Sequence, residues 1–149
     1  MPSPSRHRLL PIVLAYLPVP AIGAALSAAW NVGASPEGGA GDMFLRGTAL
    51  TPPLFLPALL LAGALAARRD GAASRAGAGV TTFVGLAFLA GSTLNLPNDF
   101  AAAEAAGTPL ALSGFLAAIH IGLSIGLLFN AVPTLLGREQ RSTETAPAG

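Results

Sequence analysis

Residues 105–137 read AAGTPLALSGFLAAIHIGLSIGLLFNAVPTLLG and contain no charged side chain. Glu104 precedes this run and Arg138 follows it. The hydrocarbon core of a bilayer is about 30 Å thick, so a helix that crosses it needs roughly 20 apolar residues. The run is longer than this minimum. It therefore predicts a membrane-spanning helix, which we place at residues 110–132.

The rest of the chain contains three more charge-free stretches, at residues 9–36, 47–67 and 76–98. After the polar and turn residues are trimmed, they predict spanning helices at residues 9–30, 50–67 and 78–96. The expected fold class is therefore all-α, an integral membrane bundle of four transmembrane helices with up-down topology. It forms one domain over residues 1–137, followed by a disordered cytoplasmic tail at residues 138–149.

The overall composition agrees with a membrane protein. Of the 149 residues, 10% are charged and 52% are hydrophobic, whereas soluble domains carry about 25% charged residues. Disordered chains are polar and rich in charge, so disorder of the whole chain is excluded. The absence of cysteine excludes disulfides, a thiol nucleophile and iron–sulfur clusters.

The arginines indicate how the chain is oriented. Seven of them fall on one side of the membrane if four helices alternate: Arg6, Arg8, Arg68, Arg69, Arg75, Arg138 and Arg141. The other side holds Arg46 with four acidic residues, Glu37, Asp42, Asp99 and Glu104. Cytoplasmic loops carry the excess of basic residues, so both termini are expected in the cytoplasm. The use of arginine alone and the abundance of alanine suggest a bacterial inner membrane protein.

The N-terminal helix has an alternative interpretation. The basic residues 6–8, the apolar run and the small residues 27–29 resemble a secretory signal peptide with a cleavage site. The apolar run exceeds the usual 7–15 residues of such a peptide, which favours a retained helix. Cleavage would leave three helices with the N-terminus outside.

A ridge of small residues follows the last helix at four-residue spacing. Its members are Gly114, Ala118, Gly122 and Gly126. Small residues let helices approach closely in lipid. The ridge therefore predicts either a seam for a homo-oligomer or partner membrane protein, or packing within the bundle. Shorter rows of small residues on the other helices (Gly23 and Ser27; Ala58, Ala62 and Ala66; Ala87 and Gly91) allow the same two interpretations.

His120 is the ionisable residue that stands out within a predicted span. It lies ten residues into its helix, or about 15 Å along it, close to the membrane midplane. Such residues are functional candidates, here as a catalytic acid/base, a proton relay or a ligand-binding group. The alternative is a structural histidine bonded to a carbonyl or to Tyr16. One histidine is too few ligands for zinc or haem, so neither a metal nor a cofactor is predicted.

A second polar group lies at the outer end of the third predicted helix and comprises Ser92, Thr93, Asn95, Asn98 and Asp99. It forms either a helix end with its cap or the rim of a pocket whose floor is His120. Asn31 and Arg46 are candidates to join that rim. The predicted ligand-binding residues are therefore His120, Asn95, Asn98, Asp99, Tyr16 and Ser92.

Missing motifs narrow the possible functions. No span contains a carboxylate, which argues against a proton-coupled antiporter of the small multidrug type. There is no phosphate-binding glycine loop, no H-E-x-x-H and no G-x-S-x-G, and no basic patch suited to nucleic acid. We expect an accessory subunit or a binder of small lipophilic ligands, with the lipid bilayer as partner.

The chain also resembles a known family over about half its length. The similar segments are residues 43–55 (MFLRGTALTPPLF) and 93–99 (TLNLPND), followed by His120. They resemble the anthrone-oxygenase-like family of small four-helix membrane proteins, whose members often show an asparagine–proline–asparagine motif after the third helix. Here Asn95, Pro97 and Asn98 match it loosely, while the family's tryptophan/histidine/arginine pattern at the fourth helix is absent. The resemblance implies an alternative function, an oxygenase-like enzyme that acts on an aromatic substrate with His120 as acid/base.

Overall fold

The computed structural model describes residues 4–136 and is all-helical over that range. Its elements are α1 (Pro4–Tyr16), α2 (Pro18–Trp30), the 3-10 helix η1 (Ala40–Phe44), α3 (Phe55–Ala67), α4 (Ala72–Leu94), α5 (Leu96–Ala105) and α6 (Leu110–Leu135). Besides helices and loops, the described range contains one isolated β-bridge, between Thr48 and Thr51. The tail expected at residues 138–149 lies outside the described residues.

Within residues 4–136, three helices are long and apolar enough to cross a membrane: Arg8–Trp30, which joins α1 and α2, then α4 and α6. The helix α3 is apolar but has 13 residues. At 1.5 Å per residue it is about 20 Å long, short of a full crossing. By length the structure thus supplies three candidate spans rather than the expected four.

The expected helix at residues 50–67 begins five residues later, at Phe55. The cause lies in Pro52 and Pro53. A residue before proline is pushed out of the helical region, and proline itself lacks the N–H that a helix interior needs. The residues before Phe55 therefore take an irregular path, described below.

The other helix boundaries differ less. The N-terminal span is interrupted at Leu17, directly before Pro18, although the Leu17 N–H still donates to the Val13 carbonyl over 3.0 Å. The expected helix at residues 78–96 begins earlier, at Ala72, and ends at Leu94. The expected helix at residues 110–132 continues to Leu135, past Pro133.

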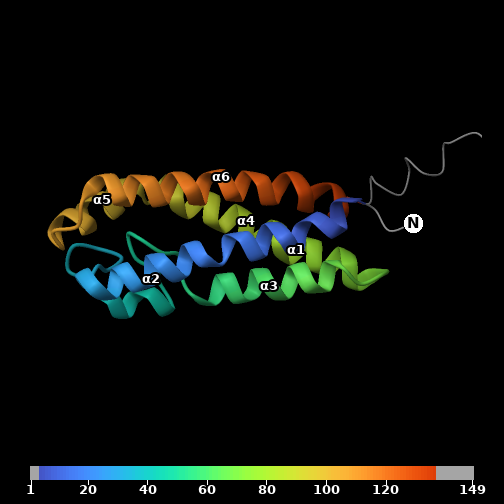
Figure 1. Cartoon of the computed structure of the whole chain (residues 1–149), viewed down its shortest axis with the longest axis horizontal. Helices are drawn as coiled ribbons and strands as arrows, with labels where there is room; N and C mark the ends of the chain where they lie inside the picture. Colours follow the sequence, from blue (N-terminus) through green and yellow to red (C-terminus); the bar gives the residue numbers. More distant parts are fainter. Residues whose placement is uncertain (1–3, 137–149) are drawn as a thin grey trace, which may run out of the picture.

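The long helices pack in a ring. The helix α4 contacts α6 and α3, and α1 contacts the same two helices from the other side. Figure 1 shows the described ends of the chain at the same end of the molecule as the α3–α4 turn, with α5 at the opposite end. The buried core inside the ring comprises Val13, Tyr16, Leu56, Leu60, Ala64, Val84, Phe88 and Leu127.

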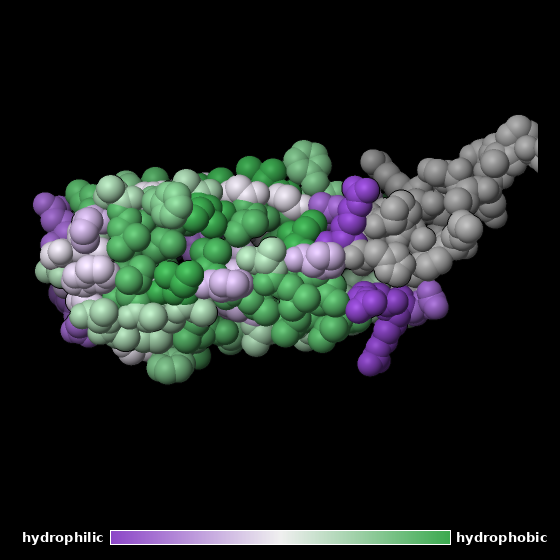
Figure 2. All heavy atoms as spheres, in the orientation of Figure 1, coloured by the Kyte–Doolittle hydropathy of each residue, from purple (hydrophilic) through white to green (hydrophobic). Residues whose placement is uncertain are grey.

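The outer surface matches a membrane environment. Figure 2 shows hydrophobic residues along the length of the molecule and hydrophilic residues gathered at its two ends. Large apolar side chains point outward from the long helices, among them Phe83, Phe115 and Phe129. Such continuous apolar surface is typical of lipid contact and not of a soluble monomer.

The helices α3 and α4 approach each other closely. A Cβ added at Gly77 would collide with the backbone of Ala67 and of Gly63. The seam is thus formed by Gly63 and Gly77, whose missing side chains let the two backbones meet. The row of small residues expected on α3 faces away from this seam, since Ala58 and Ala62 are exposed.

The small-residue ridge on α6 also faces outward. Ala118 and Gly122 are exposed, and no heavy atom lies within 4 Å of a Cβ built at Gly122 or Gly126. Internal packing therefore does not account for the ridge at Ala118 and Gly122, whereas at Gly114 the ridge faces Phe100 of α5, whose ring lies 3.7 Å from a built Cβ. A seam with a second membrane protein or a second copy stays a prediction.

Residues 47–54, which we call the strap, fold back among the helices. Ala49, Leu50 and Thr51 are buried although they belong to no helix. The Ser113 hydroxyl of α6 donates to the Ala49 carbonyl over 3.2 Å, and the Thr51 hydroxyl donates to the Pro20 carbonyl over 3.1 Å. The strap is therefore tied to both α2 and α6, and it occupies the space that a longer α3 would fill.

Candidate functional site

A cavity of about 170 Å³ lies between α4, α6 and the strap. Its walls comprise Ala34, Arg46, residues 47–53 of the strap, Leu56, Ala87, Phe88, Gly91, Ser92, Asn95, Asn98, Asp99, Leu116, Ala117 and His120. The cavity thus brings together residues from the loop after α2, the strap, α3, α4, α5 and α6. Five of the six ligand-binding residues predicted from sequence line it: His120, Asn95, Asn98, Asp99 and Ser92.

His120 lies deep in the cavity wall and is 5% exposed. Its Nδ1 is 2.8 Å from the hydroxyl oxygen of Tyr16, so one hydrogen bond joins α1 to α6. The ring of Phe88 lies beside both residues, with its centroid 5.2 Å from that of Tyr16 and 6.4 Å from that of His120. The three rings fix the orientation of the imidazole.

The other imidazole nitrogen has no such partner. Nε2 of His120 is buried and has no hydrogen-bond partner among the described residues. Buried polar groups are nearly always paired, and leaving one unpaired costs about 1–3 kcal/mol. This nitrogen has almost no exposed surface, so it is enclosed by protein rather than open to the cavity.

Tyr16 lies behind the site rather than in it. Its side chain is fully buried in the core and is not part of the cavity wall. The sequence placed Tyr16 among the ligand-binding residues, but the structure gives it the role of holding His120. The bond between Tyr16 and His120 was one of the alternatives weighed for this histidine, and the structure shows it together with the cavity.

The serines that share a face of α6 with His120 also point inward. The Ser124 hydroxyl donates to the backbone carbonyl of His120 over 2.7 Å, and Ser113 holds the strap. Both are fully buried. The two serines therefore serve the interior, while Ala117 and His120 of the same helix line the cavity.

The cavity wall formed by α4 and α5 is more polar and more exposed than the wall that contains His120. Asn95 and Asn98 are exposed, while Asp99 is half-buried. Burial raises the pKa of the Asp99 carboxyl to about 6, since the charged form is disfavoured away from water. Ser92 lines the cavity one turn deeper, whereas Thr93 is exposed and bonds back to the Leu89 carbonyl. These residues form the rim.

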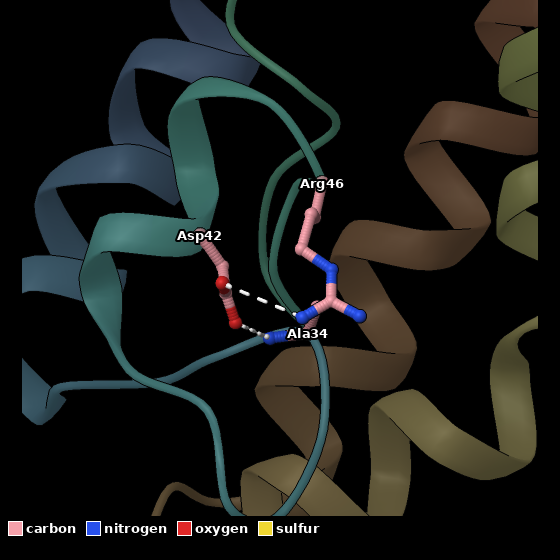
Figure 3. Close-up of polar contacts among 3 residues, drawn as sticks. All are labelled: Ala34, Asp42 and Arg46. Atoms are coloured by element: carbon pink, nitrogen blue, oxygen red, sulfur yellow. Dashed lines mark hydrogen bonds and ion pairs between the residues drawn. The ribbon is translucent and has the colours of Figure 1, made fainter.

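Arg46 reaches the rim from the loop before the strap. Its guanidinium lies 4.0 Å from the Asp42 carboxylate, and its side chain is 72% exposed. The second carboxylate oxygen of Asp42 accepts the Ala34 N–H over 3.1 Å, as Figure 3 shows. Such a long, exposed ion pair contributes little stability. Asn31, the other candidate for the rim, instead accepts a hydrogen bond from the Ala40 N–H.

Reasoning from sequence missed the strap as a wall of the site. It assigned residues 50–54 to the first turn of a helix, in which their carbonyls would accept from N–H groups four residues further along. The signal that could have revealed the strap is the pair Pro52–Pro53 within an apolar run. Irregular backbone at membrane depth occurs where it is buried in protein or lines a cavity.

Within residues 4–136, no group of three or more histidine, aspartate or glutamate side chains lies close enough to hold a metal ion. Comparison of the chain with protein-family models, with curated proteins and with solved structures finds no match. The site therefore has to be interpreted from its own geometry.

Proposed function

We propose that this protein is a membrane-embedded binder of small lipophilic ligands that contain a single aromatic ring. The observation that carries this proposal is the cavity of about 170 Å³, which has His120 among its wall residues. A protein cavity of about 150 Å³ lined by apolar residues holds benzene. The space in this protein is thus matched to one ring, and its rim is polar.

We also propose that the chain crosses the inner membrane four times, with both termini in the cytoplasm. The helix α3 and the strap together form the second crossing. The strap's buried position and its bonds to α2 and α6 support this, because irregular backbone within a membrane must be enclosed by protein. The arginine distribution supports the orientation.

The binding proposal is tested by filling the cavity. Gly91 lines the cavity, and no atom lies within 4 Å of a Cβ built on it, so we expect Gly91→Leu to extend a side chain into this space. Ala90→Leu is the matched control, since Ala90 is exposed on the same helix and does not line the cavity. The probe is 4′-fluoroacetophenone, followed by ¹⁹F NMR with the purified protein in lipid nanodiscs.

The wild-type protein and Ala90→Leu should show a saturable bound signal, and Gly91→Leu should lose it. An equal signal in all three proteins would mean that the probe dissolves in lipid, and the proposal would be rejected. In that case an accessory subunit becomes the better description, with the outward ridge of α6 as the face to test.

A second candidate function is the oxygenase-like activity implied by the family resemblance. The specific observation in its favour is that His120 and Asn95 line one cavity, as an acid/base and a substrate-binding residue must. A tricyclic ketone would have to extend from this one-ring space through the rim. Oxygen consumption by proteoliposomes with anthrone tests it. Activity that His120→Gln abolishes would support the enzyme, and no uptake above protein-free liposomes would exclude it for this substrate.

A further inference from the structure

We propose that the ligand of this cavity is a primary amine whose ammonium group pairs with the Asp99 carboxylate at the rim, while its aromatic ring, at the other end of a flexible carbon linker, lies in the apolar depth. The proposal rests on the proposed binding function and names its ligand class. It makes Asp99 the residue that selects the charge of the ligand.

Asp99 belongs to the same helical face as the deeper cavity residues of α4. The Asn95 N–H donates to the Gly91 carbonyl over 3.1 Å, and the Asp99 N–H donates to the Asn95 carbonyl over 2.9 Å. Both bonds join residues four apart, as in an α-helix, so the helical register continues from α4 into α5. Residues three or four apart in such a register share a face. The cavity residues of this segment, each three or four residues from another, are Ala87, Phe88, Gly91, Ser92, Asn95, Asn98 and Asp99. They form one stripe, which faces the cavity from its depth to its rim.

This stripe changes from apolar to charged along its length. Ala87 and Phe88 form its deep end, where Leu56 of α3 and Leu116 of α6 also line the cavity. Eleven residues separate Phe88 from Asp99, which corresponds to about 16 Å along a helix. A ligand that fits this gradient has an apolar ring at one end and a polar group at the other, since polar groups in a pocket fix the orientation of what binds there.

The carboxylate of Asp99 lacks a partner within residues 4–136. It is half-buried, and neither an ion pair nor a side-chain hydrogen bond is formed by it there. Burial raises its pKa to about 6, so at neutral pH most molecules carry a poorly solvated negative charge at this point. A primary ammonium group supplies one positive charge and three N–H donors. One donor can pair with the carboxylate, and the amide oxygens of Asn95 and Asn98 at the same rim can accept the others.

Arg46, the other charged residue in the cavity wall, does not supply the missing partner. Its guanidinium lies 4.0 Å from the Asp42 carboxylate, as Figure 3 shows, and no ion pair joins it to Asp99 in the described part of the chain. The carboxylates around this end of the molecule outnumber it and comprise Glu37, Asp42, Asp99 and Glu104. Such an excess of one charge attracts ligands of the opposite sign. The rim therefore favours a cation over an anion.

The position of Asp99 sets the length of the linker. Eight residues separate it from Gly91, or about 12 Å along a helix. The Asp99 side chain covers part of this distance because it leans toward the N-terminal end of its helix, and the hydrogen bond covers about 3 Å more. A ring beside Gly91 therefore needs a linker of about four carbons, since an extended chain advances roughly 3.5 Å for every three bonds.

Competition against bound 4′-fluoroacetophenone tests the ligand class. The ¹⁹F signal is followed with the purified protein in phosphatidylcholine nanodiscs, whose lipid has no net charge. 4-Phenylbutylamine should displace the probe about ten times more effectively than 4-phenylbutan-1-ol, which has the same ring and linker without the charge. Benzylamine should have at most about a twofold advantage over benzyl alcohol, because its ammonium group does not reach Asp99. Equal advantages for the long and the short amine would indicate unspecific attraction of cations and would overturn the proposal.

Variants test the role of Asp99. Asp99→Asn should reduce the tenfold preference to less than about threefold and should leave displacement by 4-phenylbutan-1-ol unchanged, which also reports that the cavity is intact. Glu104→Gln is the matched control, since it removes an exposed carboxylate of the same helix that does not line the cavity. An equal loss of preference in both variants would overturn the role of Asp99. Stronger displacement by 4-phenylbutyrate than by the amine would make Arg46 the selecting residue and would overturn the proposal without any variant.

The failures of the two proposals are distinguishable. If Gly91→Leu does not reduce binding of any probe, the binding function itself is wrong. If binding depends on Gly91 but 4-phenylbutylamine and 4-phenylbutan-1-ol compete equally, the cavity is a binding site and the proposed ligand class is wrong.

Discussion

The carbonyl oxygen of Leu50 lies in the space that a Cβ of Gly23 would occupy. This contact presses the strap against α2, and the side chain of Leu50 is buried beside it. The hydroxyls of Ser27 and Thr48, 2.6 Å apart, join the same two segments one turn further along. The wall of the cavity therefore depends on a glycine that has no contact with the cavity itself.

Substitution of Gly23 should displace the strap. In Gly23→Ala the new methyl group meets backbone atoms of Leu50, which cannot rotate away, and overpacking of this kind costs about 1–3 kcal/mol. We expect a lower midpoint of thermal unfolding and weaker binding of 4′-fluoroacetophenone. Gly126→Ala is the control, because open space surrounds that position. Equal midpoints for the two variants would show that the strap does not pack on α2 as described.

Stability should depend on pH through Asp99. Burial raises the pKa of this carboxyl from 3.8 to about 6, so the folded protein binds a proton more tightly than the unfolded chain. The cost of the charge is then fully present above about pH 6 and is relieved as the pH falls toward 4. Thermal unfolding of the wild type should therefore show a lower stability at pH 7 than at pH 4.5, by on the order of 1 kcal/mol.

The Asp99→Asn variant should have a flatter pH profile than the wild type. Glu104→Gln, at an exposed carboxylate of the same helix, is the matched control. If Asp99→Asn loses stability with rising pH as steeply as the wild type does, another group is responsible.

Leucine should have opposite effects at two helical glycines. At Gly77 it collides with the backbone of α3, and we expect a destabilisation of more than 3 kcal/mol or failure to fold. At Gly122 it enters open space, so the unfolding midpoint should stay within about 1 °C of the wild type.

Sedimentation of Gly122→Leu also tests the seam predicted on α6. A change from dimer to monomer would support the seam, and an unchanged oligomeric state would contradict it.

The orientation can be tested with single cysteines, because the natural chain has none. Glu37 and Ala72 are both exposed, the first in the loop after α2 and the second at the start of α4. In intact spheroplasts, an impermeant maleimide should label Glu37→Cys and should label Ala72→Cys only after lysis. The reverse pattern would invert the proposed topology, and labelling of both in intact cells would reject four crossings.

Helix formation could be predicted from the sequence wherever apolar runs lack charges. The runs around Leu110–Leu135 and Ala72–Leu94 became long helices, because a backbone without water must pair its own N–H and C=O groups. The prediction of a helix at residues 50–54 was wrong. The side chains of Thr48 and Ser113 pair backbone groups of the strap, and the Thr51 hydroxyl pairs the Pro20 carbonyl of α2. The contacts of Ser113 and Thr51 join segments distant in sequence, so no local pattern predicts them.

The faces of the helices were harder to predict than the helices themselves. In an alanine-rich chain several rows of small residues fit a packing seam, and only tertiary contacts select among them. The rows at Ala58 and at Gly122 face outward, while Gly63 and Gly77 meet. Hydrophobicity gives no help here, since residues that face lipid and residues that face other helices are equally apolar.

For the candidate site, the polar residues that stand out against an apolar background are evident from the chain alone, namely His120 in one span and the group from Ser92 to Asp99 at the end of another. That they line one cavity, that the strap closes one side of it and that Tyr16 lies behind the wall became evident from the fold. A cavity arises from packing between segments that are distant in sequence. Tyr16 and His120 are 104 residues apart, and no local pattern encodes their contact.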